Sequence, residues 1–469
     1  MAYSQSWLED PSAIRGIFVE VGVYDVVSTI ETVVYLSTVG YVTTDANISY
    51  SPLIRGGIEF TESLAVDGQA SLSFGDIELD NINGELDQWL DPTKYVWANR
   101  SIKIYLGDPR WVCANINDIH NYFELIFDGV VNDIDSRTMT RINLKIRDKL
   151  ERLNTPLTDV KLGTYGTWAD GQTNQDSIVP IVFGEVANIS PMLINPALLE
   201  YSFNKGNSEL LIELRDNGVP IYNSTTPGGA NVTHSTGKFT LTKKLVGTLT
   251  ASVQGVKDSI DIDTGNLVSG TYVNNIANLI ALITTQYGKQ STRFTAADLD
   301  LTNLSLFARN TQSVGAYISD TTNTLTVCQM LANSIGAQLF ITRKGKLQLL
   351  RIGVPTATSS ISIYPSDILS NTLSISSRTN VVAATKLGYC KNYTTQDNLL
   401  TNIPVSHKDM FKSENEWYTK TVVDSTVQNR YKLEADTQQK ETLLLVGSEA
   451  EAEATRLNNY YKVPRTVYR

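Results

Sequence analysis

The chain has 469 residues, 42% of them hydrophobic and 19% charged, which is enough apolar material for real cores and disfavours disorder of the whole chain. Acidic residues outnumber basic ones by 49 to 39, and the net charge of −10 disfavours a surface that coats nucleic acid through its phosphates. Three histidines and three cysteines, all far apart, leave few groups for the usual metal and acid–base chemistry. At roughly 100–200 residues per domain, this length predicts about three domains.

The N-terminal residues have neither a basic n-region nor an apolar h-region, so we expect no signal-directed export. The most apolar run, Ile276 to Ile283, is too short to span a bilayer, and we expect no stable membrane insertion. Cys113, Cys328 and Cys390 do not form a Cys-x-x-Cys pair and are interpreted as buried or incidental thiols.

Residues 1–157 are predicted to form an N-terminal β-rich unit. Short runs of β-branched and aromatic residues between turn formers predict strands at 17–23, 32–36, 57–60, 70–79, 101–106, 123–131 and 140–146. Short strands at this spacing are typical of a sandwich or barrel. Five of the six tryptophans lie in the first 168 residues, which favours a unit with its own core or interface: Trp7, Trp89, Trp97, Trp111 and Trp168.

Residues 158–200 are predicted to be a connector. A polar, glycine-rich stretch is followed there by a segment with three prolines, Pro180, Pro191 and Pro196. Because proline fixes φ and has no N–H, we expect this segment to be extended and loop-like.

Residues 201–355 are predicted to be a second β-rich unit with helical insertions. Its first part has short strands, and Asp216-Asn217-Gly218 predicts a tight turn between two of them. The spacing then predicts a helix over 273–287, with Asn274 or Asn275 as its N-cap and Gly288 after its end.

A second helix is predicted at 325–336, with Val327, Leu331 and Ile335 on one stripe. A hairpin that turns at Lys344-Gly345-Lys346 follows it.

Residues 356–469 are predicted to be a β-rich continuation that ends in a helix. Ser448 and Glu451 have the spacing of a capping box, and Ala450, Ala454, Leu457 and Tyr461 follow the helical period. The final residues, VPRTVYR, look like the opening of a strand. Either a truncated chain or a strand that completes a neighbour's sheet would explain them.

The sequence contains none of the common motifs of catalytic or cofactor sites. The chain has no Gly-x-Ser-x-Gly nucleophile turn, no phosphate-binding Gly-x-x-x-x-Gly-Lys-Ser/Thr and no Gly-x-Gly-x-x-Gly after a strand. His120 and His234 lie in polar stretches and are interpreted as exposed loop histidines. We therefore predict no catalytic, cofactor-binding or metal-ligating residue and no cofactor.

Asp76, Glu78 and Asp80 alternate along a predicted strand and share one face, and Asp87 follows them. A calcium loop of this spacing would need glycine where Asn81 stands and a longer acid than Asp87. A pair of acids for glycoside cleavage is a further alternative. The favoured interpretation is a solvated strand face with a hairpin turn at Asn83-Gly84.

Arg100, Lys103 and Arg110 lie near Trp97 and Trp111 in sequence. Such a mixture can stack on bases, but the wider context is not basic. A protein–protein surface is the favoured interpretation.

Several short motifs, in a fixed order, resemble the N-terminal part of tail-tip proteins of long-tailed bacteriophages. They are Asn81, Gly84 and Asp87; Arg100, Ile102, Ile104, Tyr105, Gly107 and Asp108; Phe127, Gly129 and Val130; and Leu144, Arg147 and Asp148. Later pieces, including VPIVFGEV, TLTASVQG and YYKVPR, are similar to the same proteins, so the resemblance covers nearly the whole chain. Relatives often continue past the "Y-x-V-P-R" helix, whereas this chain stops there.

The resemblance implies a baseplate hub or tail-tip subunit without enzymatic activity, located in the virion at the distal tail and assembled in the cytoplasm of the bacterial host. The implied fold is mainly β with a few helices (α+β), with two tube-like β-barrel or sandwich units, inserted helices and long loops. The implied partners are two further copies in a homotrimeric ring, the tail tube, and distal tail, tape-measure and fibre proteins. DNA would pass through the lumen during ejection without specific binding, because an acidic wall repels it.

Two alternatives remain open at the level of sequence. One is a tail-associated enzyme that degrades cell wall or polysaccharide, which needs acids converging in a cleft. The other is a receptor-binding module for host attachment. Fold resemblance alone does not decide among these functions.

Overall fold

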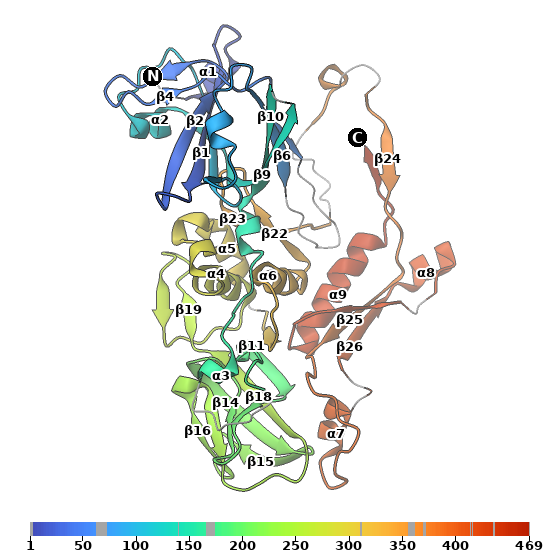
Figure 1. Cartoon of the computed structure of the whole chain (residues 1–469). Coiled ribbons are helices and arrows are strands. Elements are labelled where there is room, and N and C mark those ends of the chain that lie inside the picture. Colours follow the sequence, from blue (N-terminus) through green and yellow to red (C-terminus); the bar gives the residue numbers. More distant parts are fainter. Residues whose placement is uncertain are drawn as a thin grey trace.

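The computed structural model describes residues 3–61, 73–138, 140–165, 174–309, 312–354, 362–368, 372–412, 414, 416–434 and 437–468. The predicted fold class, mainly β with helices, is confirmed. Figure 1 shows a column of three parts, with the first β unit at the top, a helical layer in the middle and a second β unit at the bottom. The C-terminal residues run along one side of this column.

The first unit is built on one eight-stranded antiparallel sheet. Its order is β2 (Ile30–Ser37), β1 (Gly16–Asp25), β8 (Ser101–Gly107), β9 (Glu124–Thr138), β10 (Arg141–Asp148), β6 (Phe74–Asp80) and β5 (Glu59–Thr61), with β7 (Tyr95–Val96) also on β1. Each predicted strand of this unit has a counterpart here. Residues 62–72 lie outside the described part, so the start of the strand predicted at 70–79 is not described.

Strand ladders alone do not close this sheet into a barrel, but the segment 51–55 bridges its two ends. Ser37 N donates to Ser51 O at 2.8 Å on the β2 side, and Asp80 N donates to Leu53 O at 2.8 Å on the β6 side. The space inside is filled by apolar side chains, among them Val19, Val21, Leu36, Ile77, Leu79, Ile102, Ile104, Phe127 and Leu144. In the described part of the unit, a packed core therefore stands where a lumen would be.

Smaller elements cover one end of the first unit. They are α1 (Gln5–Glu9), β3 (Tyr41–Val42), β4 (Ser49–Tyr50) and α2 (Ile116–Tyr122), whereas the 3-10 turn Asp87–Trp89 packs near the other end of β1, where Trp97 Nε1 donates to Trp89 O at 2.9 Å. An aromatic cluster lies beneath them, with Phe18, Tyr50, Trp111 and Phe123 among its buried members.

The bottom unit is a sandwich of two sheets around one core. A five-stranded sheet has the order β15 (Val219–Asn223), β14 (Ser208–Asp216), β18 (Leu249–Val256), β11 (Ile181–Ile189) and β21 (Gly315–Ile318). A four-stranded sheet has the order β12 (Met192–Asn195), β13 (Glu200–Ser202), β17 (Lys238–Leu241) and β16 (Ala230–Thr233). Side chains from both sheets, such as Leu211, Phe239 and Val253, share this core.

The prediction of a loop-like connector is wrong for residues 181–195. After α3 (Leu162–Tyr165), β11 forms a buried strand that pairs with both β18 and β21. Pro180 stands before this strand, where its missing N–H removes no ladder bond. Proline density was therefore misleading, because the apolar run between the prolines determines the structure.

The tight turn predicted at Asp216-Asn217-Gly218 is confirmed. It joins β14 to β15, and Asn217 and Gly218 have φ of 47° and 84°. Two successive positive φ values are the geometry of a type I′ hairpin, which favours Asn-Gly.

The middle layer contains α4 (Ile276–Gln286), α5 (Leu301–Ala308) and α6 (Thr324–Asn333), with the hairpins β19 (Asp258–Ile260)–β20 (Leu267–Ser269) and β22 (Ala337–Ile341)–β23 (Leu347–Arg351). The predicted cap of α4 is confirmed, since the Asn275 side chain accepts from Asn278 N at 3.0 Å. The core of the middle layer also includes Leu150 and Leu157, which precede the predicted connector, and Leu443 and Ala450, which lie near the C-terminus. The boundaries at 157, 200 and 355 stay predictions.

The C-terminal residues form a mixed sheet with the order β26 (Tyr418–Val423), β25 (Ala384–Tyr389) and β27 (Gln439–Glu441). The helix α9 (Gly447–Tyr461) packs against this sheet. Two short helices, α7 (Val405–Phe411) and α8 (Ser425–Tyr431), flank it. The predicted capping box of α9 is wrong, because Val446 is the N-cap residue. The Glu451 carboxylate pairs with Lys420 on β26 at 3.0 Å and is not turned back to the helix start.

Candidate functional site

His120 and His234 do not come together. His120 lies in α2, not in a loop as predicted, with its Nε2 3.0 Å from Glu20 Oε1 and its ring stacked on Tyr105. His234 begins a 3-10 turn in the bottom unit, where burial lowers the pKa of its ring. His407 belongs to α7. Within the described residues, no group of three or more His, Cys, Asp or Glu side chains could hold a metal ion.

The acidic strand face is confirmed in part. Burial alternates along β6, so Asp76, Glu78 and Asp80 point away from the core. Asp87 does not join them, because its Oδ1 accepts from Asn81 Nδ2 at 2.7 Å. The hairpin predicted at Asn83-Gly84 is wrong, since that turn leads into the 3-10 turn Asp87–Trp89 while β6 pairs with β5 and β10.

The tryptophans of the basic and aromatic cluster are buried, whereas the Arg110 side chain is exposed. Trp97 and Trp111 are 4% and 6% exposed and belong to the cores of the first unit. Arg110 forms an ion pair with Asp108, and Arg100 pairs with Glu31 at 3.3 Å. The tryptophans therefore present no rings for stacking on bases or on a partner. Trp168 lies outside the described residues.

The motif residues that carry the resemblance have structural roles in the first unit. A Cβ on Gly129 would lie 2.4 Å from Arg147 O, so the close approach of β9 and β10 requires glycine there. Asp148 is 4% exposed and accepts from Ser73 N at 2.7 Å and Leu150 N at 3.0 Å. Asp108 accepts from Trp7 Nε1 at 3.2 Å. These side chains hold the fold together and are not arranged around a reaction centre.

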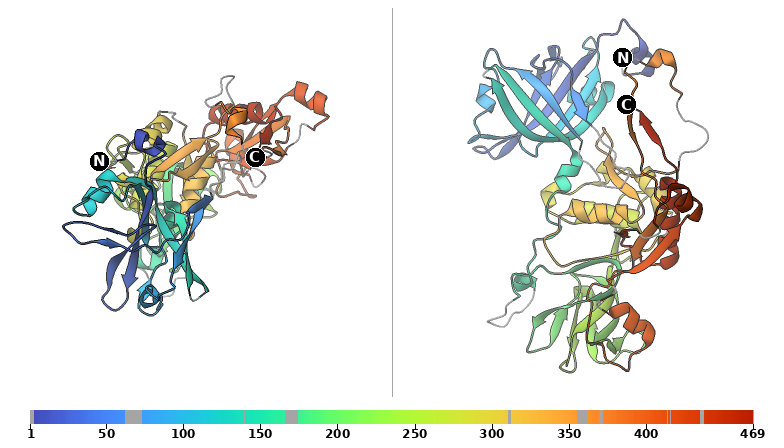
Figure 2. Two further views of the ribbon diagram at one scale, coloured as in Figure 1. Left: turned by 90° about the horizontal axis from the view of Figure 1, so that it is seen from above. Right: turned by 90° about the vertical axis from the view of Figure 1, so that its right-hand side faces the viewer.

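A two-stranded ribbon stands apart from the rest of the chain. In it β24 (Ile375–Arg378) pairs with β28 (Thr466–Tyr468), and in the described part of the chain neither has another strand partner. Every residue of β24 is exposed, and Leu373 and Ile375 are 55% and 57% exposed. Figures 1 and 2 show this ribbon projecting beyond the helix α9 toward the level of the first unit. We name β24 and β28 the C-terminal ribbon.

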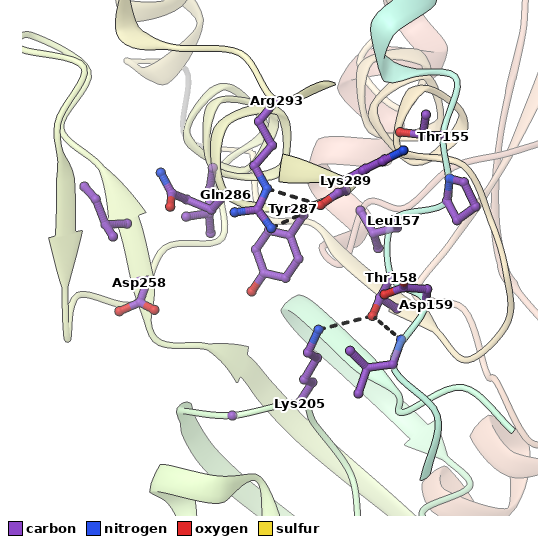
Figure 3. A pocket seen from close by; sticks show the side chains of 16 residues that line it. Thr155, Leu157, Thr158, Asp159, Lys205, Asp258, Gln286, Tyr287, Lys289 and Arg293 are labelled. Atoms are coloured by element: carbon purple, nitrogen blue, oxygen red, sulfur yellow. Dashed lines mark hydrogen bonds between the residues drawn. The ribbon is translucent and has the colours of Figure 1, made fainter. Parts of the chain in front are cut away.

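A cavity of about 860 Å³ opens between the middle layer and the bottom unit, and no sequence pattern predicted it. Four segments line it: residues 155–160, the loop at 205–206, the β19–β20 hairpin, and the end of α4 with the residues after it. Figure 3 shows Lys205 rising from below and Arg293 descending from above on either side of the Tyr287 ring. We name it the junction cavity.

Three cations, Lys205, Lys289 and Arg293, and two carboxylates, Asp159 and Asp258, line the junction cavity. Lys205 Nζ donates to Thr158 Oγ1 at 3.2 Å, and the Arg293 guanidinium donates to Gly288 O from Nε and Nη2. Lys289 is exposed at the rim. Burial lowers the pKa of Lys205, Asp159 partly offsets this effect, and Arg293 adds to it.

No helix among the described residues has both the length and the apolar character needed to cross a membrane. No protein-family model matches the chain, and no curated protein matches it. A solved chain titled "Virion of native gene transfer agent (GTA) particle" is similar over 54% of this chain and 83% of that chain, with 9% identity and a TM-score of 0.24. A similarity of that TM-score carries no argument about fold or function.

Proposed function

We propose that this protein is a structural subunit at the distal end of a long-tailed phage tail, a baseplate hub or tail-tip subunit that works in a ring and is not an enzyme. Two lines of reasoning support the proposal. The ordered motifs that resemble tail-tip proteins coincide with residues that determine the fold of the first unit. The C-terminal ribbon has the properties of a segment that another chain covers.

The C-terminal ribbon is the observation that carries this proposal. An isolated two-stranded sheet is marginally stable in water, and its outer edges leave N–H and C=O groups available for pairing. Exposed Leu373 and Ile375 add apolar surface that a partner would bury. A neighbouring copy in a closed ring would supply both the third strand and the cover.

The packed interior of the first unit bears on where the proposed channel would run. Because apolar side chains fill that unit, DNA would pass between copies and not through a single chain. The outward faces of β6 and β9 are the proposed lumen wall, since they carry Glu78, Asp80, Asp133 and Asp135. Arg141 and Lys145 neutralise part of this face through ion pairs with Glu78 and Asp135. The remaining negative charge would repel DNA and favour passage without adhesion.

Under this proposal the protein is a virion component assembled in the host cytoplasm, with tail-tube, distal-tail, tape-measure and fibre proteins around it. A homotrimer is the proposed ring. Fibres or other tip proteins would be anchored on its outer surface.

The test is the assembly state of the full-length chain, measured by analytical ultracentrifugation and by imaging of negatively stained particles. We expect a closed ring that Ile375→Lys disrupts, because the lysine would place a charge in the covered face. Val246→Lys is the matched control, since Val246 is 98% exposed and lies away from the C-terminal ribbon. A chain that stays monomeric at all concentrations, or one with muralytic activity, would contradict the proposal.

A further inference from the structure

We propose that the junction cavity is a binding site for a phosphate-class oxyanion, either as a free ion or as the phosphate group of a larger molecule. The proposal is independent of the suggested role in a phage tail. It rests on three cations that converge on this cavity and outnumber its two carboxylates, and on the space between them.

The first step is the environment of Lys205. Its side chain is half-buried, and its ammonium group donates to the neutral hydroxyl of Thr158. Asp159 is near enough to raise the pKa of Lys205, but among the described residues no carboxylate forms an ion pair with this ammonium group within 4.0 Å. Buried cations are normally paired, because removing a charge from water without a partner is costly. An anion in the cavity would supply the missing partner.

The second step is the accumulation of like charge. Arg293 faces the same cavity and is close enough to lower the pKa of Lys205, while Lys289 adds a third cation at the rim. The guanidinium uses Nε and Nη2 to hold Gly288 O, which leaves Nη1 available to a ligand. With the two carboxylates Asp159 and Asp258 in the same lining, the three cations leave a net charge of +1, which favours an anion, and Arg and Lys both bind phosphate well.

The third step concerns the remaining polar groups. Burial raises the pKa of the Tyr287 hydroxyl, so it stays protonated and can donate. Figure 3 shows that hydroxyl pointing to the side of the cavity where Lys205 and Asp258 lie. Asp258 accepts from Gly270 N at 3.1 Å and offers an acceptor to a protonated phosphate oxygen or to a ligand hydroxyl. The volume of about 860 Å³ exceeds that of one phosphate and leaves room for an ester group.

The test is titration calorimetry on the full-length chain with inorganic phosphate, glycerol 3-phosphate and acetate at constant ionic strength. We expect one saturable phosphate site per chain and at least tenfold weaker binding in Lys205→Met. Lys161→Met is the matched control, because it removes the same charge from an exposed side chain outside the cavity that pairs with Asp176. We expect its affinity to stay within twofold of the unmodified chain.

The two phosphate probes distinguish the sources of the ligand. Tighter binding of glycerol 3-phosphate would assign the site to the phosphate group of a larger molecule, and equal or tighter binding of inorganic phosphate would assign it to the free ion. The absence of saturable binding, equal binding of acetate, or an affinity that Lys205→Met leaves unchanged would overturn the proposal. If Lys205→Met fails to fold, Lys289→Met provides a second test. The Lys289 side chain is exposed and can be replaced without disturbing a core, and we expect this variant to lose phosphate affinity several-fold.

Discussion

Lys149 Nζ lies 3.0 Å from Asp298 Oδ1, and this contact joins the last residues of the first unit to the helical middle layer. The same ammonium group also pairs with Asp128 on β9. All three side chains are largely buried, between 10% and 13% exposed. Asp128 N further donates to Arg343 O at 2.8 Å, so the β22–β23 hairpin is held at the same place.

Removing the ammonium group of Lys149 should strongly weaken the contact between the first unit and the middle layer. Lys149→Met would leave two buried carboxylates without their partner, and breaking a buried pair in this way costs about 3–5 kcal/mol. We expect a clear fall in the midpoint of thermal unfolding, measured by scanning calorimetry. Lys161→Met is the exposed counterpart, since its pair with Asp176 is worth about 0–1 kcal/mol. Equal effects of the two substitutions would show that the buried pairs of Lys149 do not stabilise the contact between the first unit and the middle layer.

A single buried carboxyl group should give the first unit a pH-dependent stability. Burial raises the pKa of Asp148 from 3.8 to about 6, against the opposing hydrogen bonds from Ser73 and Leu150. The folded chain therefore favours the protonated form more than the unfolded chain does. This contribution is fully present below the unfolded pKa and is lost as the pH rises through about 6.

Asp148→Asn should remove that dependence because the amide carries no charge. Ser73 N donates to Oδ2 and Leu150 N donates to Oδ1, and the single amide oxygen can accept only one of these two hydrogen bonds. The lost hydrogen bond lowers the stability of the variant equally at every pH, whereas its stability relative to the unmodified chain should rise by at most about 3 kcal/mol between pH 4 and pH 7. Urea unfolding at several pH values would measure this. Parallel pH profiles for the two proteins would disprove the role of Asp148.

Local sequence patterns were enough to predict the elements whose signals are local. The Asn217-Gly218 turn and the Asn275 cap depend on neighbouring residues, and both are confirmed. The capping-box prediction failed at Glu451, because Lys420, on a strand distant in sequence, pairs with its carboxylate. The connector prediction failed at β11, whose pairing with β18 and β21 outweighs the flanking prolines.

The junction cavity could not be predicted for the same reason. Lys205 and Arg293 are far apart in the chain, and only the packing of the middle layer on the bottom unit brings them to one cavity. The packed interior of the first unit could not be predicted from the sequence either. Alternation of apolar and polar residues along a strand predicts which side chains face inward, but not whether they leave a lumen.

The three thiols should react slowly in the folded chain. Burial raises the pKa of Cys113, Cys328 and Cys390, which reduces the thiolate that a thiol reagent attacks. At pH 8 we expect reaction at least roughly tenfold slower than in the urea-unfolded chain. Cys390 should react first, because it is the one of the three that is only half-buried, and Cys390→Ser should remove that phase. Rapid reaction of Cys328 in the native protein would contradict its burial.

Two glycines with positive φ should respond differently to alanine, because only one has a neighbour in the way. Gly237 has φ of 62°, and a Cβ there would lie 2.0 Å from Asn204 O, a backbone atom that cannot move aside freely. Gly270 has φ of 79° and open space around the same position. Gly270→Ala should therefore cost only the conformational penalty of about 1 kcal/mol. Gly237→Ala adds overpacking of about 1–3 kcal/mol and should lower the urea midpoint of the bottom unit further. Similar midpoints for the two variants would mean that the contact with Asn204 is relieved at no cost.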